Sequence, residues 1–121
     1  MPSRFEPCGL TQLYALRYGS LPLVHRVGGL ADTVVDATSV SVAQDQATGF
    51  AFDDESPQAL MSAVSRATNL FREPELWRRV MRRAMAQDFS WEAAARGYLA
   101  VYQQLCSGVA ASDLTASPSH C

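Results

Sequence analysis

Lysine is absent from this chain of 121 residues, and all ten basic residues are arginines. The formal net charge is only -2, so the chain has no overall attraction to nucleic acid or to an anionic membrane. No apolar run approaches the ~18–20 residues that are needed to cross a bilayer. The first residues also lack the charged and apolar regions of a signal peptide. We therefore expect no nucleic-acid partner and no membrane partner.

Cysteine is scarce as well. Cys8, Cys106 and Cys121 are odd in number, and their spacing matches no disulfide or metal pattern. We therefore expect a reducing, cytoplasmic location, with no metal and no cofactor. A content of 48% hydrophobic and 18% charged residues is typical of one soluble globular domain.

Hydrophobic periodicity predicts a helix over 10–18, a strand over 21–26 and a second strand over 49–52. Between the strands, Val27–Leu30 is expected to be a flexible turn and residues 38–48 a loop without regular structure. Three further helices follow the second strand. Their predicted starts are Pro57 after the N-cap Ser56, Pro74, and the residue after the N-cap Ser90.

Both predicted strands are too apolar for a solvent-exposed pair and suit a parallel sheet that is covered on both faces. Two short strands are seldom stable alone, so we expect further strands from elsewhere. The pattern predicts an α/β fold, namely the second half of a doubly wound domain. We expect residues 1–106 to form this part and residues 107–121, rich in Ser, Ala, Thr and Pro, to be a disordered tail.

Glu6 and Gly9 stand just before the first predicted helix. Helix N-termini present unpaired N–H groups and a partial positive charge, which suits phosphate, and a glycine allows close backbone approach. In open α/β sheets such junctions lie where ligands bind. From these residues alone, a structural loop with a helix cap and a phosphate site both remain open.

The run Pro2–Leu13 resembles the signature of ADP-glucose-dependent glycogen and starch synthases of the bacterial type, glycosyltransferase family 5. The similarity continues through residues 17–36, at Gly49-Phe50 and at Phe89-Ser90-Trp91, and covers about residues 1–105. The resemblance implies the C-terminal part of a Rossmann-like domain in a GT-B glycosyltransferase. The expected reaction transfers glucose from ADP-glucose to the non-reducing end of an α-1,4-glucan, with retention.

By the same resemblance, Glu6 is the expected catalytic residue, which binds a hydroxyl of the donor glucose. The backbone N–H groups of Cys8 and Gly9 would contact the same sugar, and those of Leu10 and Thr11 would face the diphosphate. The resemblance places the basic diphosphate-binding residues and the acceptor-binding N-terminal domain upstream. We therefore expect the chain to be a C-terminal fragment that needs this missing domain as a partner and is inactive alone.

One alternative from a different class is a non-catalytic helical binding module that docks through a stripe of Trp77, Trp91 and Tyr98. Such a stripe is also typical of a core or an interdomain contact. His25 is expected to be a partly exposed structural residue. The arginines from Arg78 to Arg83 are expected to form a solvated helix face, because no aromatic residues interleave with them.

Overall fold

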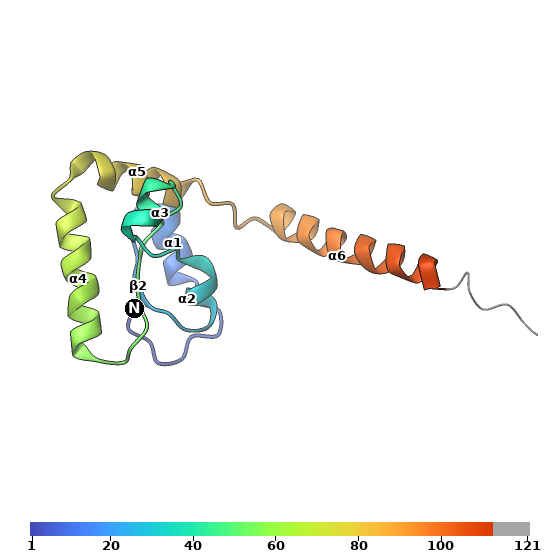
Figure 1. Cartoon of the computed structure of the whole chain (residues 1–121), viewed down its shortest axis with the longest axis horizontal. Helices are drawn as coiled ribbons and strands as arrows, with labels where there is room; N and C mark the ends of the chain where they lie inside the picture. Colours follow the sequence, from blue (N-terminus) through green and yellow to red (C-terminus); the bar gives the residue numbers. More distant parts are fainter. Residues whose placement is uncertain (113–121) are drawn as a thin grey trace, which may run out of the picture. The chain divides into compact units, whose positions relative to one another are not determined.

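The computed structural model describes residues 1–112, and their side chains as far as residue 106. The chain forms two units, one of residues 1–87 and one that begins at Asp88. Figure 1 shows the order of the elements. In the first unit they are α1 (Thr11–Arg17), β1 (Leu23–His25), α2 (Gly28–Thr33), α3 (Ser39–Ala43), β2 (Phe50–Phe52), α4 (Pro57–Phe71) and α5 (Pro74–Met85); the second unit contains α6 (Trp91–Ser112).

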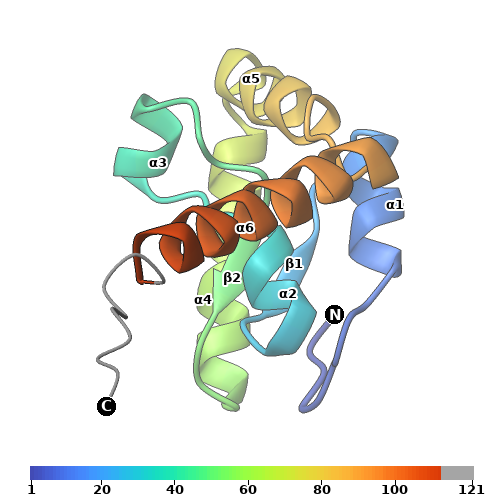
Figure 2. The ribbon, with the colours of Figure 1, turned by 90° about the vertical axis from the view of Figure 1, so that its right-hand side faces the viewer.

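The two strands pair in parallel, as predicted, over three positions: Leu23 with Phe50, Val24 with Ala51, and His25 with Phe52. Successive side chains of a strand point to opposite faces. Val24 and Ala51 accordingly pack with Leu30 of α2, whereas Leu23 and Phe50 pack with α4 and α5. Helix α2 lies on one side of the sheet and α4 on the other (Figure 2). The sheet is thus covered on both faces.

Met1 lies beside the free edge of β1. Its amino group donates to the carbonyl oxygen of Leu23 over 2.7 Å, and its carbonyl oxygen accepts from the N–H of His25 over 3.0 Å. A residue of a parallel strand bonds in this way to the neighbours of the residue opposite, which here is Val24. Met1 therefore occupies one position of a third strand.

Two predicted loops are helices in the structure. Gly28-Gly29 was expected to form a turn but begins α2, since tertiary contacts to residues 6–8 outweigh the poor helix propensity of glycine. Residues 38–48 contain α3, which a capping box between Thr38 and Ser41 stabilises. A polar segment of this kind has no apolar period, so periodicity does not reveal the helix.

The predicted starts of the later helices are confirmed. The Ser56 hydroxyl accepts from the N–H of Ala59 over 3.2 Å, and proline occupies the first turn of both α4 and α5. The Ser90 hydroxyl caps α6 in the same way, through the N–H of Ala93. Helix α6 extends to Ser112 and so enters the segment expected to be a disordered tail. The remainder of that segment, 113–121, lies outside the described residues.

Candidate functional site

The segment that precedes α1 lies over the carboxyl ends of both strands. The carbonyl oxygen of Ser3 contacts the ring of His25, the last residue of β1, at 2.7 Å. The carbonyl oxygen of Glu6 accepts from the N–H of Gly29, at the start of α2, over 3.1 Å. Arg4 pairs with Glu55, which follows β2, at 3.5 Å. The Ser3–Glu6 backbone therefore lies at the edge of a parallel sheet where ligands usually bind.

A pair of glycines allows this segment to approach α2. A side-chain carbon at Gly28 would lie 2.0 Å from the carbonyl oxygen of Glu6, and one at Gly29 would lie 2.0 Å from that of Cys8. Real Cβ atoms do not approach oxygen so closely, so only glycine fits at either position. Gly28 also has a φ of +47°, which glycine adopts without strain. The glycine pair thus sets the position of the Glu6–Cys8 backbone.

Gln12 of α1 fixes the same segment from its other side. This side chain is fully buried, and its Nε2 donates to the carbonyl oxygens of Cys8 at 3.1 Å and Gly9 at 3.0 Å. The same nitrogen lies 3.2 Å from the Thr33 hydroxyl, which in turn donates to the carbonyl oxygen of Gly29. One glutamine therefore links the predicted binding loop to α2. Neither periodicity nor the signature run predicts this role for Gln12.

The five predicted site residues lie together in this loop. Glu6 is half-buried, and its Oε2 accepts from the Ser3 hydroxyl over 3.3 Å. The Cys8 thiol is free and exposed, and Gly9 has a φ of +69°. Within the described residues, no acceptor meets the backbone N–H groups of Cys8, Gly9, Leu10 and Thr11. These four amides are therefore available to an anion or to hydroxyl groups.

His25 differs from the expectation of a partly exposed residue, because it is buried at 4% exposure. Its Nε2 lies 3.0 Å from the carbonyl oxygen of Asp53, and its ring stacks on Phe52 with centroids 5.3 Å apart. Hydrogen bonds to the Ser3 and Asp53 carbonyls raise the pKa of His25. One signal for this role is visible in the sequence, namely a polar residue within an apolar strand.

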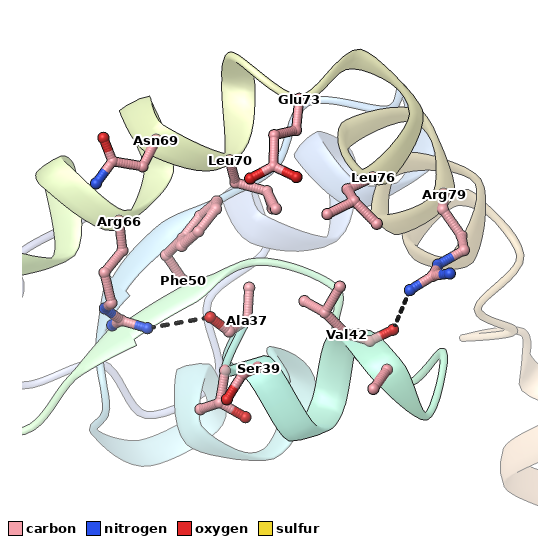
Figure 3. A pocket seen from close by; sticks show the side chains of 12 residues that line it. Ala37, Ser39, Val42, Phe50, Arg66, Asn69, Leu70, Glu73, Leu76 and Arg79 are labelled. Atoms are coloured by element: carbon pink, nitrogen blue, oxygen red, sulfur yellow. Dashed lines mark hydrogen bonds between the residues drawn. The ribbon is translucent and has the colours of Figure 1, made fainter.

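A larger pocket of about 690 Å³ lies elsewhere, between α3, α4 and α5 (Figure 3). Phe50, Leu70 and Leu76 line its apolar wall. Arg66 and Arg79 donate hydrogen bonds to the carbonyl oxygens of Ala37 and Val42, respectively, so both guanidinium groups are already engaged. Phe50 is the first residue of β2, so this pocket lies at the amino end of the strand, whereas the Glu6 segment lies at the carboxyl end. This pocket is thus separate from the predicted site.

Other candidate features have plain structural explanations. Trp77 does not belong to an exposed stripe, because it packs against Phe50 at 6.3 Å and Phe71 at 5.1 Å between ring centroids. Trp91 and Tyr98 of α6 are exposed.

Within residues 1–112 the structure contains no group of three or more side chains that could hold a metal ion. Over the same range, no helix combines the length and apolarity that a bilayer crossing requires.

Comparison with curated proteins finds bacterial glycogen synthases. The chain is 60% identical over 108 residues to the glycogen synthase of Albidiferax ferrireducens, which is 89% of this chain and 22% of that protein. It is 55% identical over 107 residues to glycogen synthase 2 of Nitrosococcus oceani, covering 88% and 22% of the two chains. A third relative, from Methylococcus capsulatus, is 52% identical over 118 residues, covering 98% and 24%.

The chain is homologous to a segment of bacterial glycogen synthases. It spans only about 22% of the length of the curated relatives that it matches. A solved structure agrees, namely the catalytic domain of starch synthase IV from Arabidopsis thaliana bound to ADP and acarbose. The TM-score is 0.70 at 39% identity, and the match covers 85% of this chain and 21% of that one.

A sucrose-phosphate synthase from Thermosynechococcus elongatus is also similar, with a TM-score of 0.53 at 29% identity, over 88% of this chain and 25% of that one. No protein-family profile matches the chain. The fold is therefore mixed α/β, with a short parallel sheet that corresponds to part of these glycosyltransferases, and the predicted fold class is confirmed.

Proposed function

We propose that the chain supplies part of the donor site of a retaining glucosyltransferase, which moves glucose from ADP-glucose to the non-reducing end of an α-1,4-glucan. The identity of 52–60% to bacterial glycogen synthases supports this assignment. The observation that carries the proposal is the position of Glu6. Its backbone is held against Gly29 at the carboxyl ends of the strands, beside four amides without an acceptor in the described chain.

Within this proposal, Glu6 is the catalytic residue. Its carboxylate binds a hydroxyl of the donor glucose and stabilises the positive charge that develops on the sugar in the transition state. The N–H groups of Cys8 and Gly9 bind the same sugar, and those of Leu10 and Thr11 face the diphosphate. The starch synthase relative was solved with ADP and acarbose, ligands of the chemistry that this arrangement would accept.

The proposed partners follow from the same homology. They are ADP-glucose, an α-1,4-glucan and an N-terminal domain that provides the acceptor site, while the basic groups for the diphosphate come from an upstream segment. Met1 bonds to β1 as one position of a third strand, which suits a sheet that further strands of the same domain complete. No metal or cofactor is required, and free thiols at Cys8 and Cys106 suit the cytoplasm. We expect the isolated chain to be inactive, because such catalysis needs several preorganised groups.

A graft experiment tests this proposal. Residues 1–106 replace the matching segment of a bacterial glycogen synthase, and glucose incorporation from ADP-glucose is measured with Glu6 and with Glu6→Gln. We expect the Gln variant to lose activity by ~100-fold or more, in the range seen when one group that stabilises transition-state charge is removed. Glu75→Gln, which changes an exposed carboxylate on α5, is the matched control. Equal activity of the Glu6→Gln graft and the unmodified graft would remove Glu6 from the site.

The alternative function is a non-catalytic binding module, and the exposure of Trp91 and Tyr98 is the observation in its favour. Trp77 no longer contributes, since it packs on Phe50 and Phe71. A module predicts that the 121-residue chain does not bind ADP-glucose in a calorimetric titration. Measurable binding of ADP-glucose favours the donor-site fragment.

A further inference from the structure

His25 joins two segments that are far apart in the sequence. Its Nδ1 lies 2.7 Å from the carbonyl oxygen of Ser3, and its Nε2 lies 3.0 Å from the carbonyl oxygen of Asp53. The first oxygen belongs to the segment that carries Glu6, and the second follows β2. The imidazole is therefore the bridge between the proposed donor loop and the end of the sheet.

Both partners of this ring are carbonyl oxygens, which only accept hydrogen bonds. A neutral imidazole has one N–H group, so one of its nitrogens would face a carbonyl oxygen without a proton between them. The imidazolium has two N–H groups and satisfies both contacts. Because the side chain is buried at 4% exposure, a carbonyl oxygen that faced an unprotonated ring nitrogen would lose its donor, and the geometry favours the cationic form.

The charged groups around the ring are consistent with a cation at this position. Asp53 pairs with Arg26 at 3.0 Å, and Glu55 pairs with Arg4 at 3.5 Å, so each nearby carboxylate already has an arginine partner. Hydrogen bonds to the Ser3 and Asp53 carbonyls raise the pKa of His25, the charges of Glu55 and Asp53 act in the same direction, and burial opposes them. The nearby Met1 ammonium is engaged with the carbonyl oxygen of Leu23.

We propose that His25 is a positioning residue of the donor site, which as an imidazolium fastens the Ser3–Glu6 segment to the carboxyl end of the sheet. We call the two contacts of the imidazolium, to the carbonyl oxygens of Ser3 and Asp53, the clamp. The effect of His25 on sugar transfer rests on the function proposed above, whereas the clamp itself does not. Loss of the proton breaks one of the two contacts and frees either the Ser3 or the Asp53 carbonyl. The Glu6 segment is then held less firmly as the pH rises.

The clamp is tested first in the unmodified 121-residue chain. Long-range ¹H–¹⁵N NMR of labelled histidine reports the protonation of each ring nitrogen, and the His25→Gln variant, which keeps His120, identifies the His25 signals. We expect both nitrogens of His25 to be protonated at pH 7, a pKa above ~6.5, the ordinary value for histidine, and backbone shifts at residues 3–6 that follow the titration. An unprotonated ring nitrogen at pH 7 overturns the proposal, and so do backbone shifts that ignore the titration.

The positioning role is then tested in the graft with His25→Gln, which keeps a donor but does not titrate, and with His120→Gln as control. At pH 7 we expect kcat/KM of the His25→Gln graft to fall ~10-fold, as a slightly misplaced group would cause. Above the pKa of His25 the kcat/KM values of the two grafts should converge, because the graft that keeps His25 then loses its clamp as well. If the ratio of the two kcat/KM values does not change with pH, His25 only packs against its neighbours and the positioning role is wrong.

The two proposals can fail separately. If the Glu6→Gln graft keeps full activity while NMR shows a doubly protonated His25, the function of the site is misassigned and the clamp stands. If Glu6 is essential but His25 is neutral at pH 7, the clamp is wrong and the donor site stands.

Discussion

Gly29 donates its backbone N–H to the carbonyl oxygen of Glu6 over 3.1 Å. This bond joins the first turn of α2 to the segment that carries the proposed catalytic carboxylate. It is possible because Gly29 has no side chain, since a Cβ there would lie 2.0 Å from the carbonyl oxygen of Cys8. The position of Glu6 therefore depends on a residue that follows it by more than twenty positions in the chain.

Gly29→Ala should destabilise the protein by ~1–3 kcal/mol, in the range of overpacked sites, because the obstructing atom is backbone and cannot rotate away. Gly97→Ala is the matched control, since no atom lies within 4 Å of a Cβ built at this position in α6. The Gly97→Ala change should raise the stability of α6 by ~0.5–1 kcal/mol. Thermal unfolding followed by circular dichroism measures both. A Gly29→Ala variant as stable as the parent would contradict the close approach.

Gln12→Leu should cost ~1–3 kcal/mol, because the part-buried hydrogen bonds to the carbonyl oxygens of Cys8 and Gly9 are lost. Gln12→Glu should cost more at neutral pH, since it places a carboxylate against acceptor oxygens. The pKa of the introduced carboxyl should then be raised, so the excess cost over Gln12→Leu appears as the pH rises above ~4.3, the ordinary value for Glu. Urea unfolding at pH 4 and pH 7 is the measurement, and an excess cost that does not change with pH would refute the assigned contacts.

Arg66 and Asp36 form the most connected ion pair of the first unit. Arg66 Nη1 lies 2.9 Å and 3.0 Å from the two carboxylate oxygens, and Nη2 donates to the carbonyl oxygen of Ala51 over 2.7 Å. Asp36 also accepts from the N–H of Ala51. Because the Asp36 side chain is only 13% exposed, Arg66→Met should leave its charge with the Arg26 guanidinium, at 4.0 Å, in place of the closer Arg66 contacts.

We expect Arg66→Met to cost ~2 kcal/mol, below the ~3–5 kcal/mol of a fully buried pair, because the Arg66 side chain is 36% exposed. Arg78→Met breaks the exposed pair with Glu75 on α5 and serves as the control, with an expected change within ~0.5 kcal/mol. Chemical denaturation of the two variants compares them directly. Equal costs would show that burial of Asp36 has no energetic consequence.

The raised pKa of His25 also makes stability depend on pH. A group whose pKa is higher in the folded state contributes stability that is fully present below its unfolded value of ~6.5 and is lost as the pH rises through the folded pKa. The melting temperature of the parent should therefore exceed that of His25→Gln by more at pH 6 than at pH 9. His120→Gln provides the reference. A difference that grows toward alkaline pH would reverse the assigned sign.

The N-terminus of α6 provides a prediction within the second unit. Hydrogen bonds from the side chain and backbone of Ser90 lower the pKa of Asp88, and the charge of Arg96 adds to this effect. Ser90→Ala should therefore raise the pKa of Asp88 toward its ordinary value, as measured by ¹³C NMR of the carboxyl carbon. The same change removes the α6 cap, at a typical cost of ~1 kcal/mol. Ser56→Ala removes the equivalent α4 cap and should leave the Asp88 titration unchanged.

Local patterns predicted much of the fold. The parallel strands and the starts of α4 and α5 follow from apolar runs and from Ser56, Pro57 and Pro74, whose effects act over a few residues. The existence of α2 and α3 does not follow from periodicity. Helix α2 begins with two glycines that are fixed by residues 6–8, and α3 depends on a polar capping box. These features come from tertiary contact or side-chain hydrogen bonding, which a periodic pattern does not contain.

The candidate site was predictable only in part. The signature run predicts Glu6 and the residues from Cys8 to Thr11 as site residues, and their roles stay a prediction. The groups that hold this loop, Gln12 and His25, were missed or given a minor role. Gln12 reaches Thr33, and His25 reaches Asp53, so each acts across a distance in sequence that no local spacing records.

Met1 bonds to both neighbours of Val24 and packs against the core beside α2. This residue is thus a structural part of the sheet. Any residues joined upstream of it, such as those of the graft, have to leave along the strand edge in an extended conformation. Deletion of Met1 would remove both hydrogen bonds and the apolar contact, and so loosen the edge against which His25 and the Ser3–Glu6 segment are set.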